Sequence, residues 1–95
     1  MSVGQEKAAR LVRYAGRVQG VGFRYAAAGI ACGHPVAGYV KNLPDGRVEL
    51  YAEGAPDAVD AFLAAVRARW RRSVENEQIE EMTPSGRCTR FEIAH

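Results

Sequence analysis

The sequence has few cysteines and no long apolar run, and these absences exclude several classes of protein. Its 95 residues include only Cys32 and Cys88, with neither a CxxC motif nor a Cys/His spacing typical of a zinc site. Two distant cysteines in a reducing compartment favour buried free thiols over a disulfide. No apolar stretch is long enough to span a membrane, and residues 1–10 lack the apolar core of a signal peptide. We therefore expect a cytoplasmic protein without a membrane partner.

The sequence also lacks a strong excess of charge. Thirteen Lys and Arg residues stand against eleven Asp and Glu residues, which leaves a net charge of +2. Such a balance does not indicate nucleic-acid binding. The arginines around Trp70 fit the last turn of a helix, where the helix dipole favours cations. We expect a monomer with no nucleic-acid partner.

The remaining composition is that of one small globular domain. Apolar residues make up 47% of the chain, which is enough for a core at this length. There is no internal repeat, low-complexity tract or linker. We predict a frayed N-terminal lead-in at residues 1–9 and a single domain at residues 10–95.

Residue patterns predict two helices and four or five strands. Partial alternation of apolar residues predicts strands at residues 11–18, 36–42, 47–53, 78–82 and 88–94. Alanine-rich residues 23–32 and the amphipathic stretch from Pro56 to Trp70 predict helices. The turn residues 43–46 predict a hairpin whose second arm is half buried.

This order of elements predicts an α+β protein with the ferredoxin-like βαββαβ architecture, in which both helices cover one face of a mainly antiparallel sheet. A short fifth strand would end the chain. In this architecture the first two strands run parallel with the third between them. The C-terminal ends of the first two strands therefore lie roughly 10 Å apart at one end of the sheet. Arg24 and Asn42 can then reach a common site.

The segment best suited to binding an anion is residues 16–24. Gly20 and Gly22 permit backbone conformations in which successive amides face one anion, and the start of the next helix adds a partial positive charge. Arg24 supplies a guanidinium that can bind two phosphate oxygens. Tight packing is the alternative interpretation of such a glycine turn.

Residues 16–24 do not match two other glycine-rich motifs that bind phosphate groups. No Lys-Ser/Thr pair follows the last glycine, as a P-loop requires, and Tyr25 occupies the third glycine position of a dinucleotide-binding motif. A nucleophilic cysteine is also absent from it. At the hairpin, Asn42 has the alternative role of a turn residue bonded to nearby backbone, and Asp45-Gly46 fits the turn itself.

Residues 16–24 and residues 38–49 together closely resemble the two signature segments of the acylphosphatases. The likeness extends over essentially the whole chain. It implies hydrolysis of the carboxyl–phosphate bond of a small acyl phosphate, which gives a carboxylate and inorganic phosphate. The resemblance puts the family's catalytic arginine at Arg24 and its catalytic asparagine at Asn42. It puts the phosphate-binding loop at Gln19, Gly20, Val21, Gly22, Phe23 and Arg24.

The mechanism implied by the resemblance requires no metal and no cofactor. Arg24 and the loop amides would neutralise charge on the phosphoryl oxygens, and Asn42 would orient the attacking water. A phosphate oxygen of the substrate would accept the proton from that water, as is proposed for the family. The sequence contains no cluster of carboxylates suited to a metal ion.

Two other functions share parts of this pattern. RNA-recognition domains have the same βαββαβ order, but residues 47–53 carry one aromatic and two acids where their signature requires aromatics. Acylphosphatase-like domains also begin larger hydrogenase-maturation proteins that act on carbamoyl phosphate and continue into zinc-binding CxxC segments, whereas this sequence ends at His95. We expect a standalone acylphosphatase, with a non-catalytic RNA- or phosphate-binding module as the alternative.

Overall fold

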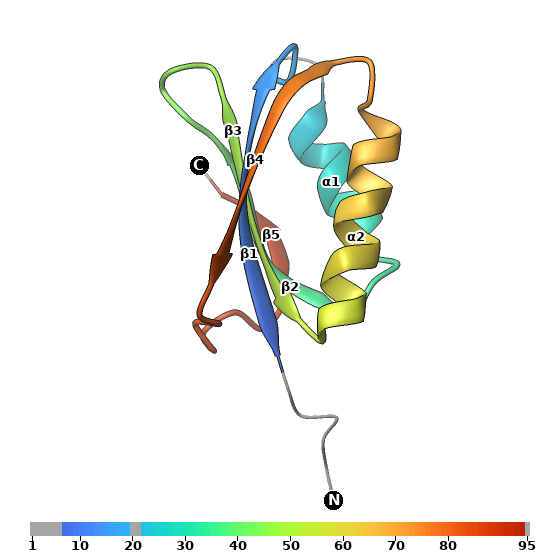
Figure 1. The fold of residues 1–95 in the computed structure, drawn as a ribbon, viewed down its shortest axis with the longest axis vertical. Helices are drawn as coiled ribbons and strands as arrows, with labels where there is room; N and C mark the ends of the chain where they lie inside the picture. Colours follow the sequence, from blue (N-terminus) through green and yellow to red (C-terminus); the bar gives the residue numbers. More distant parts are fainter. Residues whose placement is uncertain (1–6, 20–21, 95) are drawn as a thin grey trace, which may run out of the picture.

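The chain forms two helices and a five-stranded sheet in the part that the structure, a computed structural model, describes: residues 7–19 and 22–94 (Figure 1). In chain order the elements are β1 (Ala8–Gly16), α1 (Phe23–Ala31), β2 (Val36–Asn42), β3 (Val48–Gly54), α2 (Pro56–Arg69), β4 (Val74–Met82) and β5 (Phe91–Ile93). This order confirms the predicted ferredoxin-like α+β fold. The short fifth strand is present.

The strands lie in the order β4-β1-β3-β2-β5. β3 pairs antiparallel with both β1 and β2, so β1 and β2 run parallel, as the sequence predicts. Val48 of β3 pairs with Tyr14 of β1 on one side and with Asn42 of β2 on the other. The C-terminal ends of β1 and β2 therefore lie at the same end of the sheet.

Some boundaries differ from those expected. β1 begins at Ala8, so Ala8 and Ala9 belong to the sheet and not to the lead-in; residues 1–6 lie outside the described residues. β4 begins at Val74, although residues 75–77 are strongly polar. Its backbone pairs with β1 at the edge of the sheet, where polar side chains can remain in solvent. β5 is shorter than predicted and begins at Phe91.

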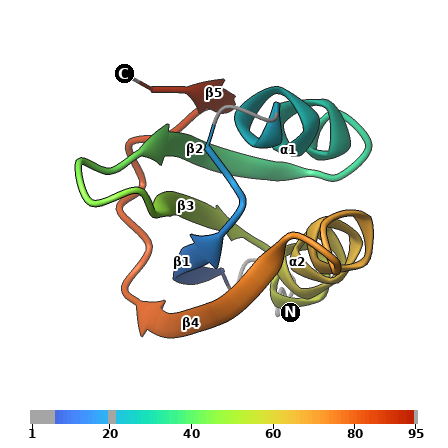
Figure 2. The same cartoon turned by 90° about the horizontal axis from the view of Figure 1, so that it is seen from above.

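Both helices pack on one face of the sheet and enclose the main core (Figures 1 and 2). α2 buries Val59, Phe62, Leu63 and Val66, the apolar stripe expected from the sequence. Complete burial of each such large side chain contributes about 1.5–3 kcal/mol to folding. Neither helix is long and apolar enough to cross a membrane, within the described residues.

The opposite face of the sheet is crossed by residues 83–90, here called the strap, which connects β4 at one edge to β5 at the other (Figure 2). The backbone N–H and the hydroxyl of Ser85 both donate to Glu53 Oε1 at 3.0 Å. The hydroxyl of Tyr51 donates to the same oxygen at 2.6 Å. The expectation that β3 is half buried is therefore wrong, because the strap and its neighbours leave Glu53 only 3% exposed.

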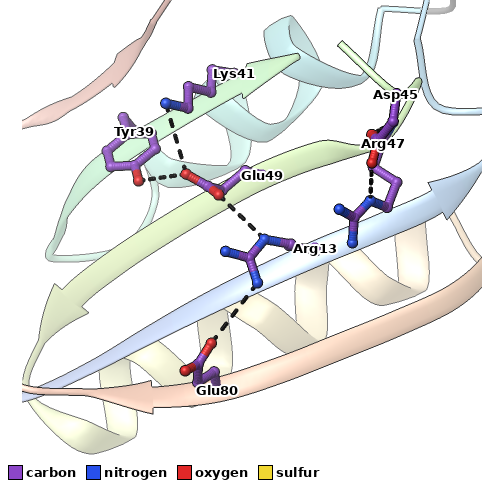
Figure 3. Close-up of polar contacts among 7 residues, drawn as sticks. All are labelled: Arg13, Tyr39, Lys41, Asp45, Arg47, Glu49 and Glu80. Carbon is purple, nitrogen blue, oxygen red and sulfur yellow. Dashed lines mark hydrogen bonds and ion pairs between the residues drawn. The ribbon is translucent and has the colours of Figure 1, made fainter. Parts of the chain in front are cut away.

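A second carboxylate on this face is held between two cations (Figure 3). Glu49 accepts a hydrogen bond of 2.7 Å from the Tyr39 hydroxyl and lies 3.4 Å from Arg13 Nε and 3.9 Å from Lys41 Nζ. Burial and the bond to Glu49 raise the pKa of Tyr39 well above its usual value. The strap-covered face thus carries two fixed carboxylates near its centre.

The two cysteines are free, as expected, but neither is fully buried. Cys32 is exposed because it follows Ala31, the last buried position of α1. Cys88 lies in the strap and is only partly covered where it packs near Tyr39 and Tyr51.

Glu53 provides a pH-dependent test of the strap. Burial alone would raise the pKa of its carboxyl group, but the hydrogen bonds from Tyr51 and Ser85 outweigh this and lower it. Because the folded-state pKa is lowered, the stabilisation is present at neutral pH and is lost as the pH falls through that pKa. We expect Glu53→Gln to reduce the free energy of unfolding by about 1–3 kcal/mol at neutral pH. The difference in unfolding free energy between this variant and the unmodified chain should shrink below pH about 4.

Urea unfolding at a series of pH values measures this difference. Glu92→Gln is the matched control, because Glu92 is exposed on β5 and its ion pair with Arg90 lies at the surface. A Glu53→Gln difference that stays constant across the acidic range would contradict the role assigned to the carboxylate.

Candidate active site

Arg24 and Asn42 line one pocket of about 170 Å³, together with Val18, Gly22, Phe23 and Tyr25. The structure therefore brings together the two side chains that the sequence expects to share a site. The volume of this pocket is below the range of about 300–1,000 Å³ typical of pockets for drug-sized ligands, and it suits a group of the size of a phosphate. Gly20 and Val21 of the predicted phosphate loop lie outside the described residues.

Asn42 reaches this pocket because it is the last residue of β2. Its backbone is held opposite Val48 of the central strand, and its side chain is exposed. In the described part of the chain, no hydrogen bond engages that side chain. The alternative role of Asn42, a local bond to the turn backbone, is therefore not observed there, and its amide remains available to a ligand.

The loop toward the pocket starts where β1 approaches the segment before β4. Gly16 has a φ of 127°, and a Cβ at this position would lie 2.4 Å from the Ser73 carbonyl oxygen. The next residue, Arg17, donates its backbone N–H to the same oxygen at 2.8 Å. Only glycine permits this approach, which determines where the loop leaves the sheet.

α1 begins at the pocket with an unusual backbone conformation. Gly22 precedes the helix in the left-handed region, with a φ of 84°. A Cβ there would meet nothing within 4 Å, so the conformation and not the lack of space favours glycine. Among the described residues no side-chain hydrogen bond caps this end, and the first turn contains no acidic residue. The partial positive charge of the helix start is therefore not offset by a carboxylate of α1.

Phe23 anchors the start of α1 in the core. Its ring is 1% exposed and lies 5.0 Å from the ring of Tyr14 and 5.1 Å from that of Trp70, measured between centroids. Val18 is equally buried and adds a second apolar wall. Since Phe23 is fixed on both sides, the neighbouring Arg24 is presented from a rigid position.

The Gln19 side chain connects the loop to the hairpin that carries Asn42. Its Nε2 donates to the Leu43 carbonyl oxygen at 2.8 Å and to the Arg47 carbonyl oxygen at 2.9 Å. These two residues close the hairpin turn, because Leu43 N–H also donates to the Arg47 carbonyl at 2.8 Å. The sequence places Gln19 in the phosphate loop but does not reveal this link, since its acceptors lie more than twenty residues away.

The hairpin turn is itself braced by Asp45. One carboxylate oxygen accepts the backbone N–H of Arg47 at 3.0 Å, and the other accepts Arg47 Nε at 2.8 Å. The backbone bond, aided by the Arg47 guanidinium, lowers the pKa of Asp45. The prediction that Asp45 serves the turn is confirmed.

Other pockets of the described residues do not contain this pair of side chains. One of about 200 Å³ between α2 and β4 and one of about 420 Å³ beside the hairpin are each lined by two arginines and two acids. Residues 68–73, which include three arginines, line another of about 300 Å³ at the C-terminal end of α2, where the helix dipole is negative. In the described residues, no group of three or more His, Cys, Asp or Glu side chains is arranged to hold a metal ion.

The Gln19 link can be tested by stability. Gln19→Ala removes two hydrogen bonds of about 1 kcal/mol each, so we expect the free energy of unfolding to fall by about 1–3 kcal/mol. Gln78→Ala is the matched control, because Gln78 is exposed on β4. Urea unfolding measures this free energy, and an equal decrease in the two variants would show that the link adds no stability.

Comparisons with known proteins agree with the fold and identify the family. A family model described as Acylphosphatase matches residues 11–93. An acylphosphatase of Methylococcus capsulatus is 46% identical over 83 residues, which cover 86% of this chain and 90% of that protein. The crystal structure of acylphosphatase from Bacillus subtilis matches with a TM-score of 0.81 at 38% identity and covers 95% of this chain and 100% of that one. An acylphosphatase structure from Coxiella burnetii matches with a TM-score of 0.83 at 28% identity, over 99% of this chain and 100% of that one. The chain belongs to the acylphosphatase family, whose members hydrolyse acyl phosphates.

Proposed function

We propose that the pocket at the start of α1 binds the phosphoryl group of an acyl phosphate and that water held by Asn42 attacks it. The observation that carries this proposal is that Arg24 and Asn42, from two separate elements, line the same small pocket. Family membership supports the reaction class, and the pocket supports the assignment of residues. Neither a metal nor a cofactor takes part in the proposed reaction.

Arg24 and the loop amides at residues 19–24 neutralise the phosphoryl oxygens. Phosphoryl transfer places negative charge on the equatorial oxygens in the transition state, and donors already aimed at them lower the barrier. A guanidinium can bind two such oxygens at once. The helix start supports this function because no acidic residue in the first turn of α1 opposes the anion.

Asn42 orients the nucleophile without acting as a base. Its amide oxygen accepts a hydrogen bond from water, whose oxygen then attacks phosphorus in line with the leaving carboxylate. A new P–O bond forms, the bond between phosphorus and the acyl oxygen breaks, and a phosphate oxygen of the substrate takes the proton from the water. A carboxylate is a weakly basic leaving group, so positioning can supply most of the catalysis.

The alternative function as an RNA-binding module gains no support from the strap-covered face. RNA-recognition domains stack bases on exposed aromatic rings of the sheet. Here Tyr51 is 7% exposed and donates to Glu53, and Glu49 is fixed beside it on the same strand. Carboxylates in these positions repel a phosphate backbone.

Substitution of the two side chains tests the proposal. We expect Arg24→Ala to lower kcat for benzoyl phosphate by about 10³-fold or more, because removal of a phosphoryl-binding arginine has effects of this size. Asn42→Ala should lower kcat by about 10²–10³-fold, comparable to loss of one preorganised hydrogen-bonding group. Initial rates measured with EDTA present give both values.

Matched controls separate catalysis from folding. Arg72→Ala and Asn76→Ala remove the same side-chain types from exposed positions outside this pocket and should leave the rate within twofold. Circular dichroism verifies that each variant is folded. Near-normal turnover in a folded Arg24→Ala or Asn42→Ala variant would refute the assigned role, and a rate abolished by EDTA would refute the metal-free reaction.

A further inference from the structure

Tyr25 lies at the pocket with a large exposed side chain that the fold does not require. It is 69% exposed, and the other large apolar side chains exposed in the described residues, Ile79 and Met82, both lie on β4. α1 buries Phe23, Ala27 and Ala31, which form the face directed toward the core. Tyr25 is off this face, and no hydrogen bond or ring contact involves it in the described part of the chain. Packing therefore does not explain an aromatic residue here.

The position of Tyr25 relates it to the reaction instead. It shares the pocket with Arg24 and Asn42 and immediately follows Arg24 in the first turn of α1. Val18 and Phe23 also line the pocket but are buried, each at 1% exposure. Among the described lining residues, Tyr25 alone offers a broad apolar surface that is still accessible to a ligand.

The proposed reaction requires such a surface outside the phosphate site. When Arg24 and the loop bind the phosphoryl group, the acyl group extends away from them, and a pocket of about 170 Å³ has room for little more than the phosphate itself. In-line attack also requires the carboxylate to leave on the side away from the water on Asn42. The water is assigned to Asn42 of β2, and the acyl group can therefore pack against a side chain from a different element, Tyr25 of α1.

Resting on the function proposed above, we propose that the Tyr25 ring is the surface on which the acyl group packs. The site then prefers acyl phosphates with aromatic or extended apolar acyl groups over acetyl phosphate, whose single methyl group covers little of the ring. Ring-on-ring contact accounts for a difference of about 3–10-fold in binding. Such a contact is made equally in the ground state and the transition state, so it acts on KM and not on kcat.

The test compares benzoyl phosphate and acetyl phosphate with the unmodified chain, Tyr25→Ala and Tyr25→Phe. We expect Tyr25→Ala to reduce the preference for benzoyl phosphate, measured as the ratio of the two kcat/KM values, by about 3–10-fold through a higher KM. Tyr25→Phe retains the ring and should retain the preference. Ile79→Ala, which removes an exposed apolar side chain from β4, is the matched control.

The outcomes distinguish this inference from the proposed function. If the unmodified chain hydrolyses neither substrate, the proposed function fails and this inference fails with it. If it hydrolyses both and Tyr25→Ala leaves the ratio within twofold, only the role of Tyr25 is refuted. Loss of the preference in Tyr25→Phe would also refute it, since the hydroxyl would then be the recognised group. Competitive inhibition by inorganic phosphate reports separately on the phosphate site, and its inhibition constant should stay within twofold in Tyr25→Ala.

Discussion

The pairing of β3 with both β1 and β2 is the constraint on which the site depends. Val48 lies opposite Tyr14 on one side and Asn42 on the other, so a single residue of the central strand aligns the ends of the two parallel strands. A shift of either pairing by one residue would reverse the side-chain faces of that strand. It would also move Asn42 away from the loop that begins after β1. The proposed catalytic arrangement therefore depends on backbone register before it depends on any side chain.

Around this alignment, the loop is supported by three separate parts of the fold. Gly16 and Arg17 hold its beginning against Ser73, before β4. Gln19 connects it to the hairpin turn, and Phe23 holds its end between aromatic rings of β1 and the segment after α2. Support of this kind fixes both ends of the loop before substrate binds, which would lower the reorganisation required during the proposed reaction.

The sequence predicts those features whose causes are local. Glycines before a helix, the turn at Asp45 and the apolar stripe of α2 follow from neighbouring residues. The two motifs point to Arg24 and Asn42, which line one pocket. Three features depend on partners distant in sequence and could not be predicted: the Gln19 link, the length of β4 and the strap. Residues 75–77 resemble a loop because they are polar, and only pairing with β1 makes them a strand. Likewise, the alternation of residues along β3 predicts an exposed Glu53, and only the hydrogen bonds from Ser85 of the strap explain its burial.

The acidic character of β4 has a consequence for how copies of the molecule meet. β4 is a nine-residue strand at the edge of the sheet, and it leaves the apolar side chains of Ile79 and Met82 exposed. An edge of this length is a template for strand addition from another chain. Four glutamates are distributed along it, at residues 75, 77, 80 and 81. Two such edges brought together would place these glutamates close to one another. The same polar residues that obscure β4 in the sequence therefore disfavour its pairing with the β4 of a second molecule.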